Sequence, residues 1–243
     1  MGSLDSIRKI AIIVGALFIT ATVAYSIGIA LIDPILDAPD YITEIAENEN
    51  QVKIGSLFVL IDAVAVVGIA VMIFPVLRKV NESLALWYVG ARIAESILFI
   101  IFVFSVLMLS TLSKNSANAG AMDSAHVQTS GDLLIAVGGW VDVLNYTAVF
   151  AIGALFLYFL LYQSRLVPRP LSVWGFLGGM LCIVAGLSVM FGADSSSVGV
   201  IALYLPIAAN EMVLAGWLIV KGFDLSAAQE SFGNEPTAKE ETS

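Results

Sequence analysis

Six long apolar runs, separated by short polar segments, occupy most of this sequence. Each run is long enough to cross the roughly 30 Å hydrocarbon core of a bilayer as an α-helix. A hydrophobic fraction of 59 % excludes an ordinary soluble domain, whose surface needs many more polar residues. The sequence therefore predicts an all-α integral membrane protein whose residues 1–223 form one six-transmembrane-helix bundle. The helices are expected at residues 10–32, 54–77, 85–112, 133–162, 171–192 and 198–222.

Basic residues beside the apolar runs predict the orientation of this bundle. They gather in every second polar segment, as Arg8 and Lys9, Arg78 and Lys79, Arg165 and Arg169, and Lys221. Segments rich in Lys and Arg stay on the cytoplasmic side of a membrane. Both termini are therefore predicted to be cytoplasmic, in a multi-pass protein of the cell membrane.

Three of the polar segments outside the predicted helices carry predictions of their own. In the acidic segment 33–49, Asp40 is suited to cap a short helix whose Ile42 and Ile45 would face the membrane surface, and a solvated linker is the alternative. Segment 113–131 is rich in Ser, Asn, Ala and Gly, which predicts a flexible loop. Residues 224–243 are polar and predict a disordered tail.

Ionisable residues inside the apolar runs are the strongest functional signal. Asp62, Arg92, Glu95, Asp142 and Glu211 are all expected at bilayer depth, where a charge costs about 2.5 to 3.5 kcal/mol on insertion scales. Counting about 1.5 Å per residue predicts one layer containing Arg92, Glu95 and Glu211, and an outer layer containing Asp62 and Asp142.

Helical spacing also predicts which polar residues face the interior of the bundle. Residues three or four apart share one helix face, so Arg92 and Glu95 point the same way, and Asp142, Asn145 and Tyr146 form a second polar stripe. The full candidate polar site consists of Asp62, Arg92, Glu95, Asp142, Asn145, Tyr204, Asn210 and Glu211.

One arginine cannot neutralise four carboxylates. Either some of the carboxyls are protonated at neutral pH, or the interior contains water, or a cation binds there. Burial and mutual repulsion favour the first option for at least one of Asp62, Asp142 and Glu211. The alternative for the arginine is structural: Arg92 would pair with Glu95 or Glu211 and so fix the packing of helices.

The sequence predicts no catalytic, cofactor-binding or metal-ligating set. His126 is the sole histidine and Cys182 the sole cysteine, which excludes a three-histidine zinc site and a cysteine cluster. There is no Gly-rich phosphate loop with a lysine. The net charge of -9 and the absence of a basic patch argue against a nucleic-acid partner.

Three stretches resemble the family catalogued as domain of unknown function 4386, which consists of small multi-pass membrane proteins of bacteria and archaea. They are residues 74–95, with Leu84-Ala-Leu followed by Arg92-x-x-Glu95, residues 160–175, and residues 210–223, which end in Trp-Leu-Ile-Val-Lys-Gly-Phe. The resemblance implies Arg92, Glu95, Glu211 and Lys221 as positions typical of the family. It implies a prokaryotic source and no particular activity.

Three functions remain compatible with these residues. The first is small-ligand binding or proton- or cation-coupled transport, because buried carboxyls suit a proton, a cation or a small molecule. The second is an accessory or sensory subunit that packs against a membrane protein partner or a second copy of itself. The third is an intramembrane enzyme acting on a lipid, for which no pair of nucleophile and base is visible.

Overall fold

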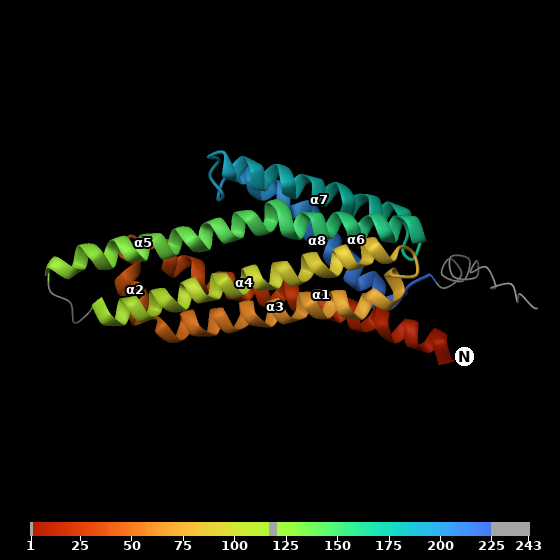
Figure 1. The fold of residues 1–243 in the computed structure, drawn as a ribbon, viewed down its shortest axis with the longest axis horizontal. Coiled ribbons are helices and arrows are strands. Elements are labelled where there is room, and N and C mark those ends of the chain that lie inside the picture. Colours follow the sequence, from red (N-terminus) through yellow and green to blue (C-terminus); the bar gives the residue numbers. More distant parts are fainter. Residues whose placement is uncertain (1, 117–120, 225–243) are drawn as a thin grey trace, which may run out of the picture.

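A computed structural model describes residues 2–116 and 121–224, and its regular structure within these ranges is entirely helical (Figure 1). Six of its helical segments are long and apolar enough to cross a membrane. This confirms the predicted all-α membrane bundle. The elements are α1 (Gly2–Leu36), α2 (Tyr41–Glu47), α3 (Glu49–Leu77), α4 (Glu82–Ser116), α5 (Ala121–Leu144), the π-helix η1 (Asn145–Val149), α6 (Phe150–Ser164), α7 (Arg169–Met190) and α8 (Val198–Val220).

The six spans form a ring in chain order. Helix α1 packs against α3, α3 against α4, and α4 against the continuous rod of α5, η1 and α6, which forms one span. The rod packs against α7, α7 against α8, and α8 returns to α1. Figure 1 shows α1, α3 and α4 side by side on one side of the rod, with α7 on the other. The ring leaves an interior that side chains from every span can reach.

Small residues bring α1 and α3 close together. A Cβ atom on Gly55 would lie 2.7 Å from Cγ1 of Ile32 and 3.0 Å from the carbonyl oxygen of Gly28. Such distances leave no room for a side chain, so the two backbones touch directly. Close approach through glycine is a common way for membrane helices to gain packing contacts.

A second close contact closes the ring between its first and last spans. The Arg8 guanidinium on α1 donates hydrogen bonds to the carbonyls of Ile219 (2.8 Å) and Val220 (3.0 Å) at the end of α8. The last carbonyls of a helix have no partner within the helix, so Arg8 caps α8. The beginning of α1 and the end of α8 therefore lie at the same end of the bundle (Figure 1).

The acidic segment contains a helix, α2, as one of the two alternatives predicted, but its direction differs from the prediction. Ile45 is fully buried and Ile42 is partly buried against the core, so α2 faces the bundle and not the membrane surface. Asp40 precedes α2 but makes no capping hydrogen bond with its side chain. The Tyr41 hydroxyl donates a 2.7 Å hydrogen bond to Asp132 on α5, and this contact turns α2 inward.

Burial of Tyr41, its hydrogen bond to Asp132 and the negative charge of that carboxylate together raise the pKa of the Tyr41 phenol above its usual range. The phenol therefore stays neutral, and remains a hydrogen-bond donor, at every physiological pH.

Segment 113–131 is mostly helical, in contrast to the flexible loop predicted there. Helix α4 continues to Ser116, α5 begins at Ala121, and residues 117–120 lie outside the described ranges. Tertiary contacts explain the difference: Lys114 forms a 2.7 Å ion pair with Glu49 on α3, and Tyr41 contacts α5. As a result the α4–α5 hairpin extends beyond the α7–α8 hairpin (Figure 1). The predicted disordered tail lies outside the described residues, apart from Asp224.

Candidate polar cavity

A cavity of about 930 Å³ lies inside the ring of spans. It reaches from Ser195, in the connection between α7 and α8, down to Arg92, Glu95 and Glu211. Ser195 is exposed, whereas Arg92 and Glu95 are buried. The cavity therefore runs from the α7–α8 connection, at the end of the bundle opposite the start of α1 and the end of α8, to a charged floor within the bilayer-spanning region.

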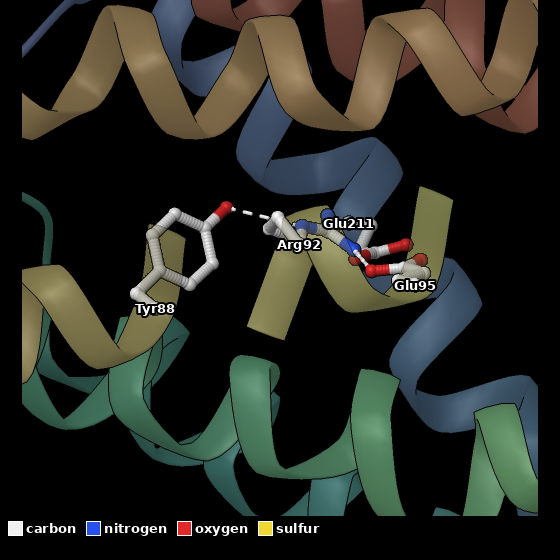
Figure 2. A network of polar contacts seen from close by, with 4 residues as sticks. All are labelled: Tyr88, Arg92, Glu95 and Glu211. Atoms are coloured by element: carbon white, nitrogen blue, oxygen red, sulfur yellow. Dashed lines mark hydrogen bonds and ion pairs between the residues drawn. The ribbon is translucent and has the colours of Figure 1, made fainter. Parts of the chain in front are cut away.

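The floor is organised by Arg92 (Figure 2). Its Nη1 donates a 2.6 Å hydrogen bond to Oε2 of Glu95, and its Nε donates a 3.3 Å hydrogen bond to the Tyr88 hydroxyl. Its Nη2 lies 3.9 Å from Oε1 of Glu211 on α8. Tyr88, Arg92 and Glu95 share one face of α4 because they are three and four residues apart. Glu211 is brought to them from the other side of the cavity.

Aromatic rings surround the Arg92 guanidinium. Its Cζ atom lies 5.9 Å from the ring centre of Phe18, 5.8 Å from that of Tyr88 and 5.6 Å from that of Phe150. Aromatic rings within about 6 Å attract a cation, and the Tyr88 ring also directs its hydroxyl toward Arg92. Arg92 is only 4 % exposed, so these rings and the two carboxylates replace its water shell.

Asp62 belongs to this floor and not to the outer layer in which it was expected. Its side chain lines the cavity and is 3 % exposed. The charged groups that act on it are Glu95, Arg92 and Glu211. The expected depth was too small because α3 begins at Glu49, which places Asp62 about 20 Å along its helix. Among the described residues, the Asp62 carboxyl has no hydrogen-bond partner.

Asp142 and three tyrosines form the middle of the cavity. The Tyr25 hydroxyl on α1 donates a 3.3 Å hydrogen bond to Oδ1 of Asp142 on α5. The ring of Tyr146 lies 6.3 Å from that of Tyr25 and 5.3 Å from that of Tyr204 on α8. Side chains from three different spans therefore meet at this level, above the Arg92 floor.

The two predicted asparagines lie outside the cavity lining. Asn210 donates a 3.0 Å hydrogen bond from Nδ2 to the carbonyl of Leu171, and so joins α8 to the first turn of α7. Asn145 is the first residue of η1, is buried, and has no hydrogen-bond partner for either amide atom among the described residues. Thr147 in η1 packs directly on Gly186 of α7. The predicted stripe of Asp142, Asn145 and Tyr146 is thus divided: Asp142 and Tyr146 face the cavity.

Tyr25 was not predicted as a site residue, although the sequence contains a signal for it. Thr22, Tyr25, Ser26 and Ile29 recur at helical spacing in the first apolar run, and all four line the cavity. Cys182, the sole cysteine, is buried and also lines it. In the described ranges, no three His, Cys, Asp or Glu side chains are placed to hold a metal ion.

Chemically, the cavity combines an excess of carboxyl groups with aromatic walls. Asp62, Glu95, Asp142 and Glu211 all line it, and Arg92 is the single basic residue among the lining residues. Apolar side chains supply most of the remaining surface. Such a site attracts positive charge and can exchange protons, while its walls accommodate an apolar or aromatic body.

A ring of six apolar spans around a charged interior cavity defines a polytopic helical membrane protein. The chain belongs to the family described as Domain of unknown function (DUF4386), whose family model matches residues 13–222. This confirms the resemblance inferred from three sequence stretches, and the match includes the cavity floor and Lys221. No curated protein and no solved structure matches the chain.

Proposed function

We propose that the protein binds a small cationic ligand in the polar cavity and couples this binding to proton exchange, as a small transporter does. One observation carries the proposal: four carboxyl groups and one guanidinium line a single cavity inside the membrane bundle. Ionisable groups at this depth usually mark a path for an ion, a proton or a substrate.

The geometry of Arg92 supports this function over a purely structural role. Its 2.6 Å contact is with Glu95, three residues away on the same helix, and that contact does not connect two spans. Its interhelical neighbour Glu211 is 3.9 Å away, which is long for a charge-assisted hydrogen bond. A residue retained only to join helices is expected to make its shorter contact across the interface.

Charge balance supports the coupling to protons. If all four carboxyls were ionised, the cavity would carry three uncompensated negative charges, which is costly in a low dielectric. We infer that the empty cavity holds one or more protons on Asp62, Asp142 or Glu211. A bound cation would favour the ionised carboxylates, so binding releases protons and the apparent affinity rises with pH.

The walls support an organic cation as the ligand. The cavity volume lies in the range that holds drug-sized molecules. Tyr25, Tyr146 and Tyr204 meet beside Asp142, so a cation with an aromatic or aliphatic body would contact ring faces and a carboxylate together.

The proposed orientation follows from the basic residues. Arg8 and Lys221 lie at the end of the bundle where α1 begins and α8 ends. By the positive-inside rule this end is cytoplasmic, and the cavity then opens toward the outer face of the cell membrane. Reporter fusions after residues 79 and 194 would test this: the first should report the cytoplasm and the second the outside.

Binding can be tested with tetraphenylphosphonium as the probe cation, using titration calorimetry on detergent-purified protein. We expect saturable binding that releases protons, detected by repeating the titration in buffers of different ionisation enthalpy. Tetraphenylborate, which has the same shape and the opposite charge, should not compete. Asp62→Asn and Glu211→Gln should each weaken binding by about tenfold or more, because one carboxylate near a cation in a dry site contributes more than about 1.4 kcal/mol.

Glu82→Gln is the matched control, because Glu82 lies in the first turn of α4, is exposed and does not line the cavity. Equal weakening by Glu82→Gln, or no saturable binding to the parent protein, would refute the proposal. Uptake of the same cation into proteoliposomes under a pH gradient then tests transport. Binding without uptake would instead favour a sensory or accessory role.

A further inference from the structure

A second pocket lies at the opposite end of the molecule from the cavity mouth. It has a volume of about 500 Å³ and is formed by the α6–α7 connection and the end of α8. Arg165, Arg169 and Lys221 line it, together with Trp217 and one carboxylate, Asp224. Three cations against one anion give the pocket a positive charge in a protein whose net charge is -9.

The position of this pocket matches the depth of lipid headgroups. The fourth span ends at Ser164, the fifth begins at Arg169 and the sixth ends at Val220. The pocket therefore lies where three spans leave the hydrocarbon core. Trp217 in its wall is the residue type that favours this interface, and the neighbouring Val220 and Tyr162 are exposed by 69 % and 42 %. These apolar side chains form a surface for acyl chains directly below the basic residues.

Two of the basic side chains in the pocket are not neutralised by an ion pair with another described residue. Arg169 stacks over the ring of Tyr162, with 5.2 Å between Cζ and the ring centre. Among the described residues, neither Arg165 nor Lys221 forms an ion pair. Arg8, by contrast, is used in capping α8. The pocket thus presents guanidinium and ammonium groups that still need an anionic partner, and arginine matches the oxygens of a phosphate particularly well.

The walls of the pocket are held in place before any ligand arrives. Leu166 and Val167 are buried, and the backbone N–H of Asp224 donates a 2.8 Å hydrogen bond to the carbonyl of Leu166. Arg165 ends α6 in a left-handed conformation with φ 56°, which is uncommon for a residue other than glycine. A fixed pocket binds its ligand at a lower entropic cost.

We propose that this pocket binds a phosphate group, supplied by the headgroup of an anionic phospholipid. Basic pockets at the ends of membrane helices are suited to such headgroups. The site is independent of the cavity and of the function proposed for it, because the two share no lining residue.

Native mass spectrometry of detergent-purified protein can test the proposal, with phosphatidylglycerol and phosphatidylcholine of identical acyl chains as probes. We expect preferential retention of phosphatidylglycerol. Replacing both Arg165 and Arg169 by Gln should weaken that retention on the order of 25-fold, at roughly fivefold for each cation near an anionic lipid. Adding Lys221→Gln should weaken it by roughly a further fivefold.

The matched control removes two cations at the α3–α4 turn, outside the pocket, through Arg78→Gln and Lys79→Gln. This variant should retain phosphatidylglycerol as the parent does. An equal loss in both double variants would show unspecific attraction and overturn the proposal, as would equal retention of both lipids by the parent. Unchanged melting temperatures in phosphatidylcholine would show that the variants are folded.

Competition with free inorganic phosphate distinguishes a lipid headgroup from dissolved phosphate as the source of the bound phosphate group. Inorganic phosphate at millimolar concentration should compete only weakly if the acyl chains contribute to binding. If phosphate alone displaces the lipid completely and stabilises the parent but not the Arg165/Arg169 variant, the site is a phosphate site filled from the water phase. If phosphate and lipid both fail to distinguish the parent from that variant, the proposal fails.

Discussion

The contact between α1 and α3 and the space between α1 and α5 show two opposite ways of arranging membrane helices. Between α1 and α3, Gly28 and Gly55 allow the two backbones to touch. Between α1 and α5, Tyr25 and Asp142 meet through the ends of their side chains. Both interfaces lie within apolar spans, so residue size and charge, and not hydrophobicity, decide whether helices close together or enclose a cavity. The comparison assigns helix packing to the first interface and leaves the second as the place of the ligand binding proposed above.

Arg92→Met should have the largest effect on stability. It removes the single cation of the cavity lining and leaves Glu95, Glu211 and Asp62 without a counter-charge. Breaking a buried ion pair by removing one partner costs about 3–5 kcal/mol. The free energy of unfolding in mixed micelles measures this loss, and adding Glu95→Gln should recover part of it. Unchanged stability would mean that the carboxyls near Arg92 are already neutral.

Gly55→Ala tests the packed interface. The added Cβ would lie 2.7 Å from Ile32 and 3.0 Å from the Gly28 carbonyl, so the helices must separate. We expect a loss of about 1–3 kcal/mol, as in other overpacked interiors. Gly90→Ala is the control, because its Cβ would meet nothing within 4 Å. Equal effects of the two substitutions on thermal unfolding would argue against close packing of α1 on α3.

Tyr41→Phe tests the contact between α2 and α5. It removes the hydrogen bond to Asp132 and should cost about 0.5–1.5 kcal/mol. The pKa of Tyr41 is raised in the folded protein, so its contribution is complete below about pH 10 and is lost as pH rises further toward the folded-state pKa. Thermal unfolding from pH 7 to 11 should show a steeper decline for the parent than for the variant.

Glu211→Gln should have the smallest effect on stability. Its oxygen is 3.9 Å from Arg92, and neutralising it relieves repulsion with Glu95 and Asp62. We expect stability within about 0.5 kcal/mol of the parent or higher, a flatter dependence of stability on pH between 5 and 9, and cation binding weakened by about tenfold or more. A large loss of stability would instead identify Glu211 as the structural partner of Arg92. The charged residues of the cavity would then serve to hold helices together, as the glycines between α1 and α3 do.

Hydropathy and helical spacing predicted the spans and the side chains that share a helix face. Arg92 and Glu95 lie together because they are three residues apart, and local spacing determines this. Helical segments beyond the ends of the predicted spans were missed. Residues 121–132 contain too few apolar residues to indicate a span. Helix α5 nevertheless extends through them, and Tyr41, from a distant part of the chain, donates a hydrogen bond to Asp132 there.

The depth of a side chain in the bundle, and the neighbouring helix that it faces, could not be predicted from single helices. Asp62 joins the Arg92 floor because α3 begins earlier than its apolar run. Asn145 is separated from Asp142 and Tyr146 at the boundary where the α-helix becomes the π-helix η1, and ideal helical spacing does not describe that boundary. Asn210 faces α7, which only the packing of α8 determines.

The cap that Arg8 places on α8 has a consequence for biosynthesis. Of the six spans, α1 leaves the ribosome first and α8 last, yet the side chain that caps α8 belongs to α1. The contact between α1 and α8 therefore cannot form until the sixth span has been synthesised. A chain whose synthesis stops before Ile219 would lack the contact between Arg8 and the end of α8. Membrane quality-control proteases are expected to remove such an incomplete bundle.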